Sequence, residues 1–177
     1  AHGGYFRAPQ PLRLTRLKIT MPNDSTPDTT SETVSKTAEQ VIDKDQIKQL
    51  CGEAYKAYDQ QDHKGALRVF YQAWLKLPKP QQDHLESSWV LTGIGDCYFK
   101  LRQFQQAIEA LSSALHCLSG EQSAFIHLRL GQCLLDIGET GSARRSLFKA
   151  FQLGGPKAFE QEPPKYPEAI KDLTAAR

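Results

Sequence analysis

The middle of the chain reads Gly95-Asp-Cys-Tyr-Phe-Lys-Leu-Arg-Gln-Phe-Gln-Gln-Ala107, and its pattern of small and large residues recurs on both sides. The preceding copy is Ala54-Tyr-Lys-Ala-Tyr-Asp-Gln-Gln-Asp-His-Lys-Gly-Ala66, and the following copy is Gly131-Gln-Cys-Leu-Leu-Asp-Ile-Gly-Glu-Thr-Gly-Ser-Ala143. Each copy starts with Gly or Ala and ends in Ala. Beyond that Ala, at helical spacing, each continues with a large apolar residue and then another Ala: Phe70 and Ala73, Leu111 and Ala114, Leu147 and Ala150.

This pattern resembles the tetratricopeptide repeat, in which small residues lie where two helices cross and larger residues fill the space beside them. The resemblance covers roughly residues 46–155. It implies an all-α fold, a right-handed α-solenoid of three helix-turn-helix units at about 46–79, 87–120 and 123–155. Gly95 and Gly131 would then let the first helix of a unit approach the second closely.

The spacing of the repeats departs from the regular period of about 34 residues. Among the alanines that end the three copies, Ala66 and Ala107 are 41 residues apart, and Ala107 and Ala143 are 36 apart. The first excess falls in the proline-containing stretch 78–84, because proline ends a helix and delays the next one. We therefore expect an extended connection between the first and second units.

Both ends of the repeat region are expected to carry flanking helices. Thr37 to Asp45 has capping-box spacing and predicts a short N-terminal helix. Pro167 suits a first helical position, so residues 167–176 are predicted to form a helix that caps the open face of the third unit. The repeat domain as a whole is expected over 37–177.

The first 36 residues have a different composition. Residues 1–20 carry four basic residues and no acid, and we interpret them as a tag or upstream sequence before Met21, with a transit peptide as the alternative. Half of the residues in 22–37 are Ser or Thr. Because so few apolar groups cannot offset the entropy of ordering, 21–36 is predicted to be disordered.

Composition narrows the classes of function. Without its basic first 20 residues the chain's net charge of +2 becomes −2, which argues against nucleic-acid binding. No apolar run is long enough to cross a bilayer. The four cysteines include no Cys-x-x-Cys pair, so we expect reduced core thiols and a cytoplasmic location. The sequence lacks residues at metal-ligand spacing, a nucleophile–base pair and a phosphate-binding loop. We therefore expect that the protein is not an enzyme and binds no cofactor or metal.

In this fold the first helix of each unit lines the concave side, and its side chains usually make the binding surface. The resemblance places ten residues there: Lys48, Tyr55, Tyr58, Trp89, Asp96, Phe99, Lys100, Phe125, Arg129 and Gln132. Aromatic residues and Arg are enriched at protein-binding hot spots. The alternative is that some of these side chains belong to the core, with the register displaced by one position.

One subclass is disfavoured by residue type. Repeat proteins that grip the carboxyl terminus of chaperones need several converging Lys, Asn and Arg donors. The corresponding positions hold Cys51, Tyr55 and Gly93, and only Arg129 agrees. The sequence therefore predicts a bacterial module that binds another protein's segment, as a secretion chaperone or a toxin-neutralising protein. The alternative is an assembly subunit that self-associates, as a homodimer, through the aromatic positions.

Overall fold

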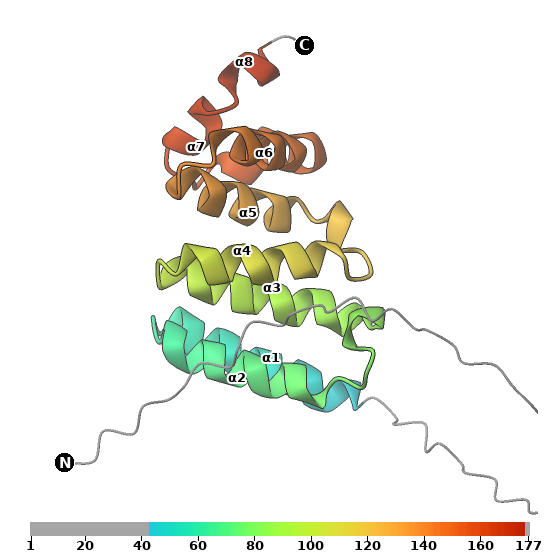
Figure 1. The fold of residues 1–177 in the computed structure, drawn as a ribbon. Helices are drawn as coiled ribbons and strands as arrows, with labels where there is room; N and C mark the ends of the chain where they lie inside the picture. Colours follow the sequence, from blue (N-terminus) through green and yellow to red (C-terminus); the bar gives the residue numbers. More distant parts are fainter. Residues whose placement is uncertain (1–42, 176–177) are drawn as a thin grey trace, which may run out of the picture. The chain divides into compact units, whose positions relative to one another are not determined.

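The computed structural model describes residues 43–175, and this part of the chain is helical. Six long helices follow one another as three hairpins, with short 3-10 turns in the connections and two very short helices at the end (Figure 1). The elements are α1 (Lys44–Asp59), α2 (His63–Lys76), η1 (Gln81–Asp83), α3 (Leu85–Lys100), α4 (Phe104–Leu115), η2 (Gly120–Gln122), α5 (Ala124–Asp136), α6 (Thr140–Gly154), η3 (Pro156–Phe159), α7 (Lys165–Glu168) and α8 (Lys171–Thr174).

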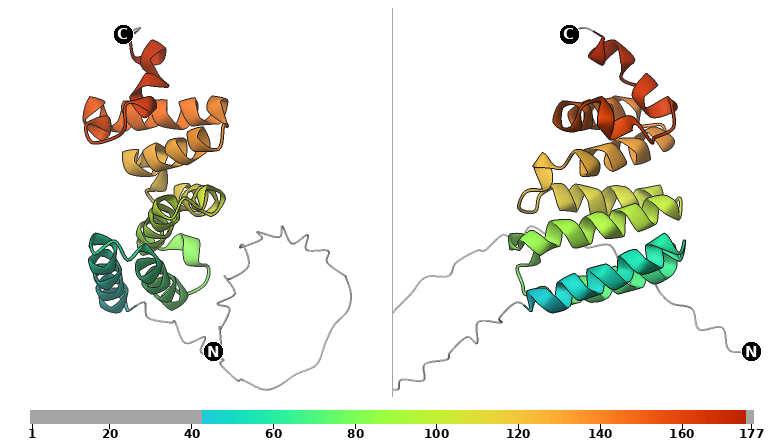
Figure 2. Two further views of the ribbon diagram at one scale, coloured as in Figure 1. Left: turned by 90° about the vertical axis from the view of Figure 1, so that its left-hand side faces the viewer. Right: turned by 180° about the vertical axis from the view of Figure 1, so that it is seen from behind.

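The hairpins stack in sequence order. The most extensive contacts are within the pairs α1–α2, α3–α4 and α5–α6, and the next are between the second helix of one pair and the first helix of the following pair. Two further views show the pairs lying one on the next (Figure 2). The first helices also meet directly, α1 with α3 and α3 with α5. The fold is therefore an α-solenoid of three helical hairpins, and α1, α3 and α5 share one face.

Close packing of the hairpins depends on the small residues that the sequence pattern marked. A Cβ atom on Gly95 would lie 2.6 Å from Leu111 of α4, and one on Gly131 would lie 2.7 Å from Leu147 of α6. Ala54 takes the equivalent place in α1 and is fully buried. The expectation that these positions allow the two helices of a unit to approach closely is confirmed by these distances.

Side-chain caps begin several of the helices. The Asp43 carboxylate accepts a hydrogen bond from Gln46 N at 2.9 Å, and Asp62 accepts one from Gly65 N at 2.8 Å. Such caps satisfy amide groups that have no partner within the helix. Both carboxylates also lie at the positive end of their helix, which stabilises the start of α1 and of α2.

Two cysteines occupy equivalent places in the second and third hairpins. Cys97 of α3 and Cys133 of α5 are fully buried, and both are free thiols. Burial disfavours the charged thiolate and raises the pKa of each thiol to about 12. They behave as small apolar core residues, as the sequence predicted.

The connection between the first two hairpins is extended, as the prolines predicted. It contains η1, and the Gln81 side chain donates to Trp74 O at 2.7 Å, which holds the connection against the end of α2. Beyond it, α3 lies so close to α2 that a Cβ atom on Gly93 would be 2.4 Å from the Phe70 ring. The loop is therefore longer than in a regular repeat, but the two hairpins still pack tightly.

The flanking helices differ from the sequence prediction. The single helix predicted over 167–176 is wrong in form: the chain has α7 and α8, separated at Ile170 by a non-helical φ, ψ of −123°, 11°. Tyr166 and Ile170 on either side of the break are both buried against the last hairpin. At the other end, Asp43 caps α1, so Lys44 and Asp45 belong to α1 itself.

Several predictions fall outside the part of the chain that the structure describes. These are the tag or upstream sequence at 1–20, the disordered segment at 21–36, the first six residues of the predicted N-terminal helix and the last two residues of the chain. The three predicted repeats lie inside it, and the helical hairpins occupy 44–76, 85–115 and 124–154.

Candidate functional site

An open hollow of about 300 Å³ crosses the face that α1, α3 and α5 share. Its lining comes from all three helices and from the turn that leads into α5. None of the eight side chains carries a charge, and four of them are hydroxyls of Ser or Thr. They are Cys51, Tyr55, Ser88, Trp89, Thr92, Ser119, Ser123 and Ile126.

A row of exposed aromatic side chains lies along the same three helices. Tyr55 of α1 is 47% exposed, Trp89 of α3 is 53% exposed and Phe125 of α5 is 40% exposed. We call these three residues the aromatic row. Within residues 43–175, every strongly exposed aromatic side chain belongs to this row. Apolar patches that a fold leaves exposed are typical of surfaces that bind a protein or another ligand.

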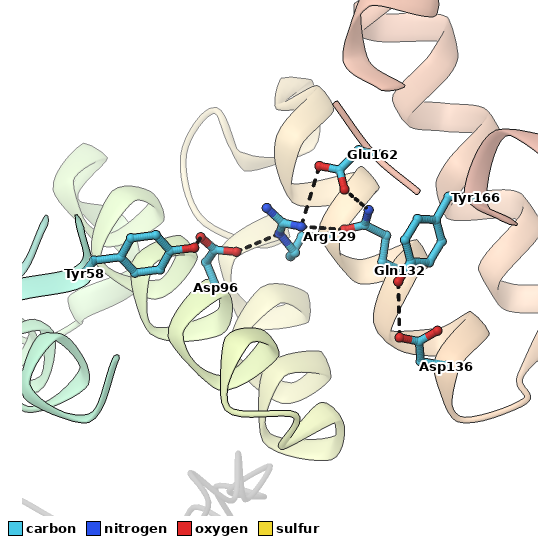
Figure 3. A network of polar contacts seen from close by, with 7 residues as sticks. All are labelled: Tyr58, Asp96, Arg129, Gln132, Asp136, Glu162 and Tyr166. Carbon is cyan, nitrogen blue, oxygen red and sulfur yellow. Dashed lines mark hydrogen bonds and ion pairs between the residues drawn. The ribbon is translucent and has the colours of Figure 1, made fainter. Parts of the chain in front are cut away.

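Farther along the same helices, a buried polar network links all three hairpins to the chain's C-terminal segment (Figure 3). Tyr58 of α1 donates a hydrogen bond to Asp96 of α3 at 2.6 Å. Arg129 of α5 lies with its Nε 2.6 Å from Asp96 Oδ1 and donates from Nη1 to Gln132 Oε1 at 2.7 Å. Gln132 donates in turn to Glu162 at 2.6 Å. We call these five residues the polar network.

The contact between Arg129 and Asp96 is an ion pair rather than an aligned hydrogen bond. The two atoms are close, but their angle lies outside hydrogen-bond geometry, and neither atom has another partner within the described residues. The Arg129 guanidinium also lies over the rings of Phe99 and Phe125, at 4.5 Å and 4.9 Å from their centroids. Pairing and ring contacts together compensate the cost of burying the charge.

Tyr58 keeps its proton in this network. Burial raises the pKa of its hydroxyl, and the hydrogen bond to the Asp96 carboxylate raises it further. A protonated Tyr58 acts as a fixed donor between the first and second hairpins. Asp96 therefore receives one neutral donor from α1 and one positive charge from α5, so a single carboxylate ties three helices together.

A second polar cluster fastens the C-terminal segment to α5. The Tyr166 hydroxyl donates to Asp136 Oδ2 at 3.1 Å (Figure 3). Lys165 forms an ion pair with the same carboxylate. Tyr166 itself is buried with Phe159 and Ile170 against the last hairpin. This segment is therefore part of the folded domain and packs on the last hairpin.

The structure separates the ten predicted groove residues into three groups by their exposure. Five are exposed, namely Lys48, Tyr55, Trp89, Lys100 and Phe125. Tyr58 and Phe99 are half-buried, and the structure places Asp96, Arg129 and Gln132 inside the polar network, where their polar atoms contact one another instead of solvent. The exposed group includes the whole aromatic row.

Several residues of the site were not found from sequence. Ser88, Ser119, Ser123 and Ile126 line the hollow, and Glu162 completes the polar network. Ser119 and Ser123 stand at the ends of the predicted units 87–120 and 123–155, outside the stretches whose small and large residues recur. Glu162 follows η3 in a segment that the repeats do not cover, so no pattern in the sequence pointed to it.

The described residues contain no cluster of three or more His, Cys, Asp or Glu side chains placed to hold a metal ion. Among the helices of residues 43–175, none combines the length and apolarity that a membrane span requires.

No protein-family model and no curated protein matches this sequence. Solved structures do match. The type III secretion chaperone SycD of Yersinia enterocolitica, in complex with a peptide of the translocator YopD, is 22% identical with a TM-score of 0.60, over 77% of this chain and 98% of that one. The chain has the tetratricopeptide-repeat fold. In that fold α1, α3 and α5 are the A helices, and α2, α4 and α6 are the B helices.

Two other solved structures show the same likeness, and one of them is a tetratricopeptide domain by its own description. PcrH has been solved from Pseudomonas aeruginosa and also in complex with the chaperone binding region of PopB. In that complex PcrH is 18% identical to this chain with a TM-score of 0.56, and the match covers 77% of this chain and 98% of that one. The first tetratricopeptide domain of Spaghetti (RPAP3), bound to the HSP90 peptide SRMEEVD, is 14% identical with a TM-score of 0.58, over 76% and 95%.

Proposed function

We propose that this protein is a protein-binding module that holds a segment of a partner protein across α1, α3 and α5. The observation that carries the proposal is the aromatic row beside the hollow. Three consecutive A helices each expose an aromatic side chain on one face, at Tyr55, Trp89 and Phe125. Exposing these side chains costs free energy that a partner would recover on binding.

The lining of the hollow indicates the chemistry of the partner segment. Hydroxyl and apolar side chains surround it, and no charge faces into it. A charged partner side chain would lose its hydration there without gaining an opposite charge. We therefore expect an extended or helical segment whose apolar side chains enter the hollow, with backbone groups meeting the hydroxyls of residues such as Ser88 and Thr92.

The solved structures with this fold support a chaperone or adaptor role. SycD is seen with a peptide of a translocator, PcrH with the chaperone binding region of PopB, and RPAP3 with an HSP90 peptide. We propose a bacterial cytoplasmic protein that acts as a secretion chaperone or as a toxin-neutralising protein, by binding and without catalysis. The neighbouring gene would distinguish the two roles, because a secretion operon favours the first and a large toxin gene the second.

Capture from a lysate of the source organism tests the proposal. Trp89→Ala removes the most exposed member of the aromatic row, and Leu75→Ala is the matched control, because Leu75 is 78% exposed on the B helix α2. We expect wild type and Leu75→Ala to retain the same protein and Trp89→Ala to lose it, as read by mass spectrometry. Equal retention by all three would place the binding surface elsewhere.

Self-association is the second candidate function. An exposed aromatic face also suits a homodimer, and one SycD structure is described as an alternative dimer. Light scattering of the purified chain decides between the two. A monomer leaves the aromatic row free for a partner, whereas a stable dimer that Trp89→Ala dissociates would show that the row binds a second copy.

A further inference from the structure

Two buried donors converge on the carboxylate of Glu162. Gln132 donates from Nε2 to Glu162 Oε2 at 2.6 Å, and Arg129 Nη1 lies 3.7 Å from Oε1. The Gln132 side chain has no exposed surface, and the Arg129 side chain is only 8% exposed. Glu162 is brought to them by the turn between η3 and α7, and its own side chain is 18% exposed. It is therefore the most exposed of the three charged side chains in the network.

The donors form an anion-binding arrangement. The Gln132 amide makes a charge-assisted hydrogen bond to this carboxylate, which is the strong class of hydrogen bond, and Arg129, whose Nη1 donates to Gln132, adds a longer ion pair. In this structure the carboxylate comes from the chain itself. The cluster then holds two carboxylates, Asp96 and Glu162, against the single positive charge of Arg129. With that excess of negative charge, a further carboxylate approaching Arg129 would be repelled.

The C-terminal segment keeps Glu162 in place from both sides. Before it, Phe159 is buried in the last hairpin, and Glu162 N donates to Phe159 O at 3.0 Å. After it, Tyr166 and Ile170 are buried, and Tyr166 contacts Asp136. A side chain anchored on both sides loses little entropy when it fills a site, so a partner's carboxylate would compete poorly with it.

We propose that Glu162 is an internal ligand that fills the anion-binding position of the shared face and so determines the specificity of the proposed binding site. The inference rests on the proposed function. It assigns recognition of the partner to the uncharged hollow and the aromatic row, and it excludes recognition through a carboxylate. In this account Arg129, the one residue that agrees with a carboxylate-gripping pattern, is already occupied. Glu162 determines specificity because its own carboxylate occupies the position that a partner's carboxylate would need.

The test compares two forms of one peptide on three forms of the protein. The probes are Ser-Arg-Met-Glu-Glu-Val-Asp, the HSP90 peptide seen with RPAP3, with a free or an amidated C-terminus. The proteins are wild type, Glu162→Ala and the control Glu160→Ala, which alters an exposed glutamate two residues away. Affinities come from titrations followed by the NMR signals of the Arg129 Nε–H and the Gln132 side-chain amide.

We expect wild type and Glu160→Ala to bind the two peptides equally within about twofold, since a filled site adds no charge-assisted contact. Glu162→Ala should prefer the free acid by about tenfold, which is the effect of one such contact. The inference is overturned if wild type already prefers the free acid to the same extent, or if Glu162→Ala shows no preference, which includes binding neither peptide.

Two controls separate this inference from other failures. Circular dichroism and a thermal melt establish that Glu162→Ala is folded, and Glu162→Ser, which stays polar but is too short to reach the two donors, should also favour the free acid if the alanine variant unfolds. The proposed function is tested separately, through Trp89. Loss of capture by Trp89→Ala together with no peptide preference in the Glu162 variants would keep the proposed function and reject the internal ligand.

Discussion

Replacing Gly93 by alanine should destabilise the protein, although alanine is the better helix former. A Cβ atom on Gly93 would lie 2.4, 2.5 and 2.8 Å from three atoms of the Phe70 ring, so α3 and α2 would have to move apart or the ring would have to shift. Phe70 is fully buried, which leaves the ring little room. Overpacking of this kind costs about 1–3 kcal/mol.

The helix-forming tendency of alanine offsets part of this cost. Gly to Ala in a helix interior contributes about 1 kcal/mol of stability. Since three ring atoms are crowded at once, we take the upper part of the overpacking range and expect Gly93→Ala to lose about 1–2 kcal/mol overall. Gly52→Ala is the matched control. Gly52 lies inside α1 with open space around it, so its alanine variant should gain about 0.5–1 kcal/mol.

Urea unfolding followed by circular dichroism measures both variants against wild type. The reasoning predicts opposite signs for one chemical change at two helix interiors. For a domain of this size, each kcal/mol also moves the thermal midpoint by about 4 °C. If Gly93→Ala proves as stabilising as Gly52→Ala, α3 does not pack on Phe70 as described, and the contact between the first two hairpins is misplaced.

Three further predictions concern the polar network, the buried thiols and the C-terminal segment. Arg129→Met should lower the free energy of unfolding by about 3 kcal/mol, because it leaves buried carboxylates without their cation. The control Arg68→Met, at an exposed arginine, should change it by less than about 0.5 kcal/mol when both are measured by urea unfolding. The free energy of unfolding should fall at alkaline pH, because burial holds the pKa of the Cys97 and Cys133 thiols near 12 instead of 9.0. The stability that these two thiols contribute is complete below pH 9.0 and is lost as the pH rises toward 12. The slope is about 1.4 kcal/mol per pH unit for each thiol, so a Cys97→Ala variant that keeps the full alkaline slope would contradict the assignment. Tyr166→Phe should lose about 1 kcal/mol with its hydrogen bond to α5, whereas Tyr166→Ala should lose about 3 kcal/mol or more with its buried ring. Equal thermal midpoints for those two variants would show that the C-terminal segment is not packed on the last hairpin.

The hairpins could be predicted from sequence because small residues at fixed spacing have a direct physical meaning. Gly95 and Gly131 recur at one place in successive repeats, and the structure puts a leucine of the partner helix against each of them. Gly93 is a different case. It contacts Phe70 of the preceding hairpin, a contact between repeats that the internal pattern of one repeat does not specify.

The candidate site could be predicted only in part. Helical spacing puts Trp89 and Asp96 on the same face of α3, yet the structure leaves one exposed and buries the other. Burial of Asp96 depends on Arg129 of another hairpin and on Tyr58 of a third, and such partners are set by tertiary packing. Glu162 is further removed, because it is supplied by an irregular segment whose course the repeat pattern does not determine.

The break between α7 and α8 was not predicted from sequence either. Pro167 suggested the start of a regular helix, and local preference alone gave no reason to interrupt it at Ile170. The structure buries Tyr166 and Ile170 in one apolar cluster. Residues four apart share one face of a continuous helix as well, so this burial does not by itself require the break.

Photo-crosslinking in the source organism tests the central claim most directly. Benzoylphenylalanine would be placed at position 89 of the aromatic row or, as the control, at position 75 on the B-helix face, both of which are exposed. The account predicts a covalent adduct with a different protein from position 89 and none from position 75. An adduct from position 75 alone, or an adduct from position 89 that contains only a second copy of this chain, would contradict it.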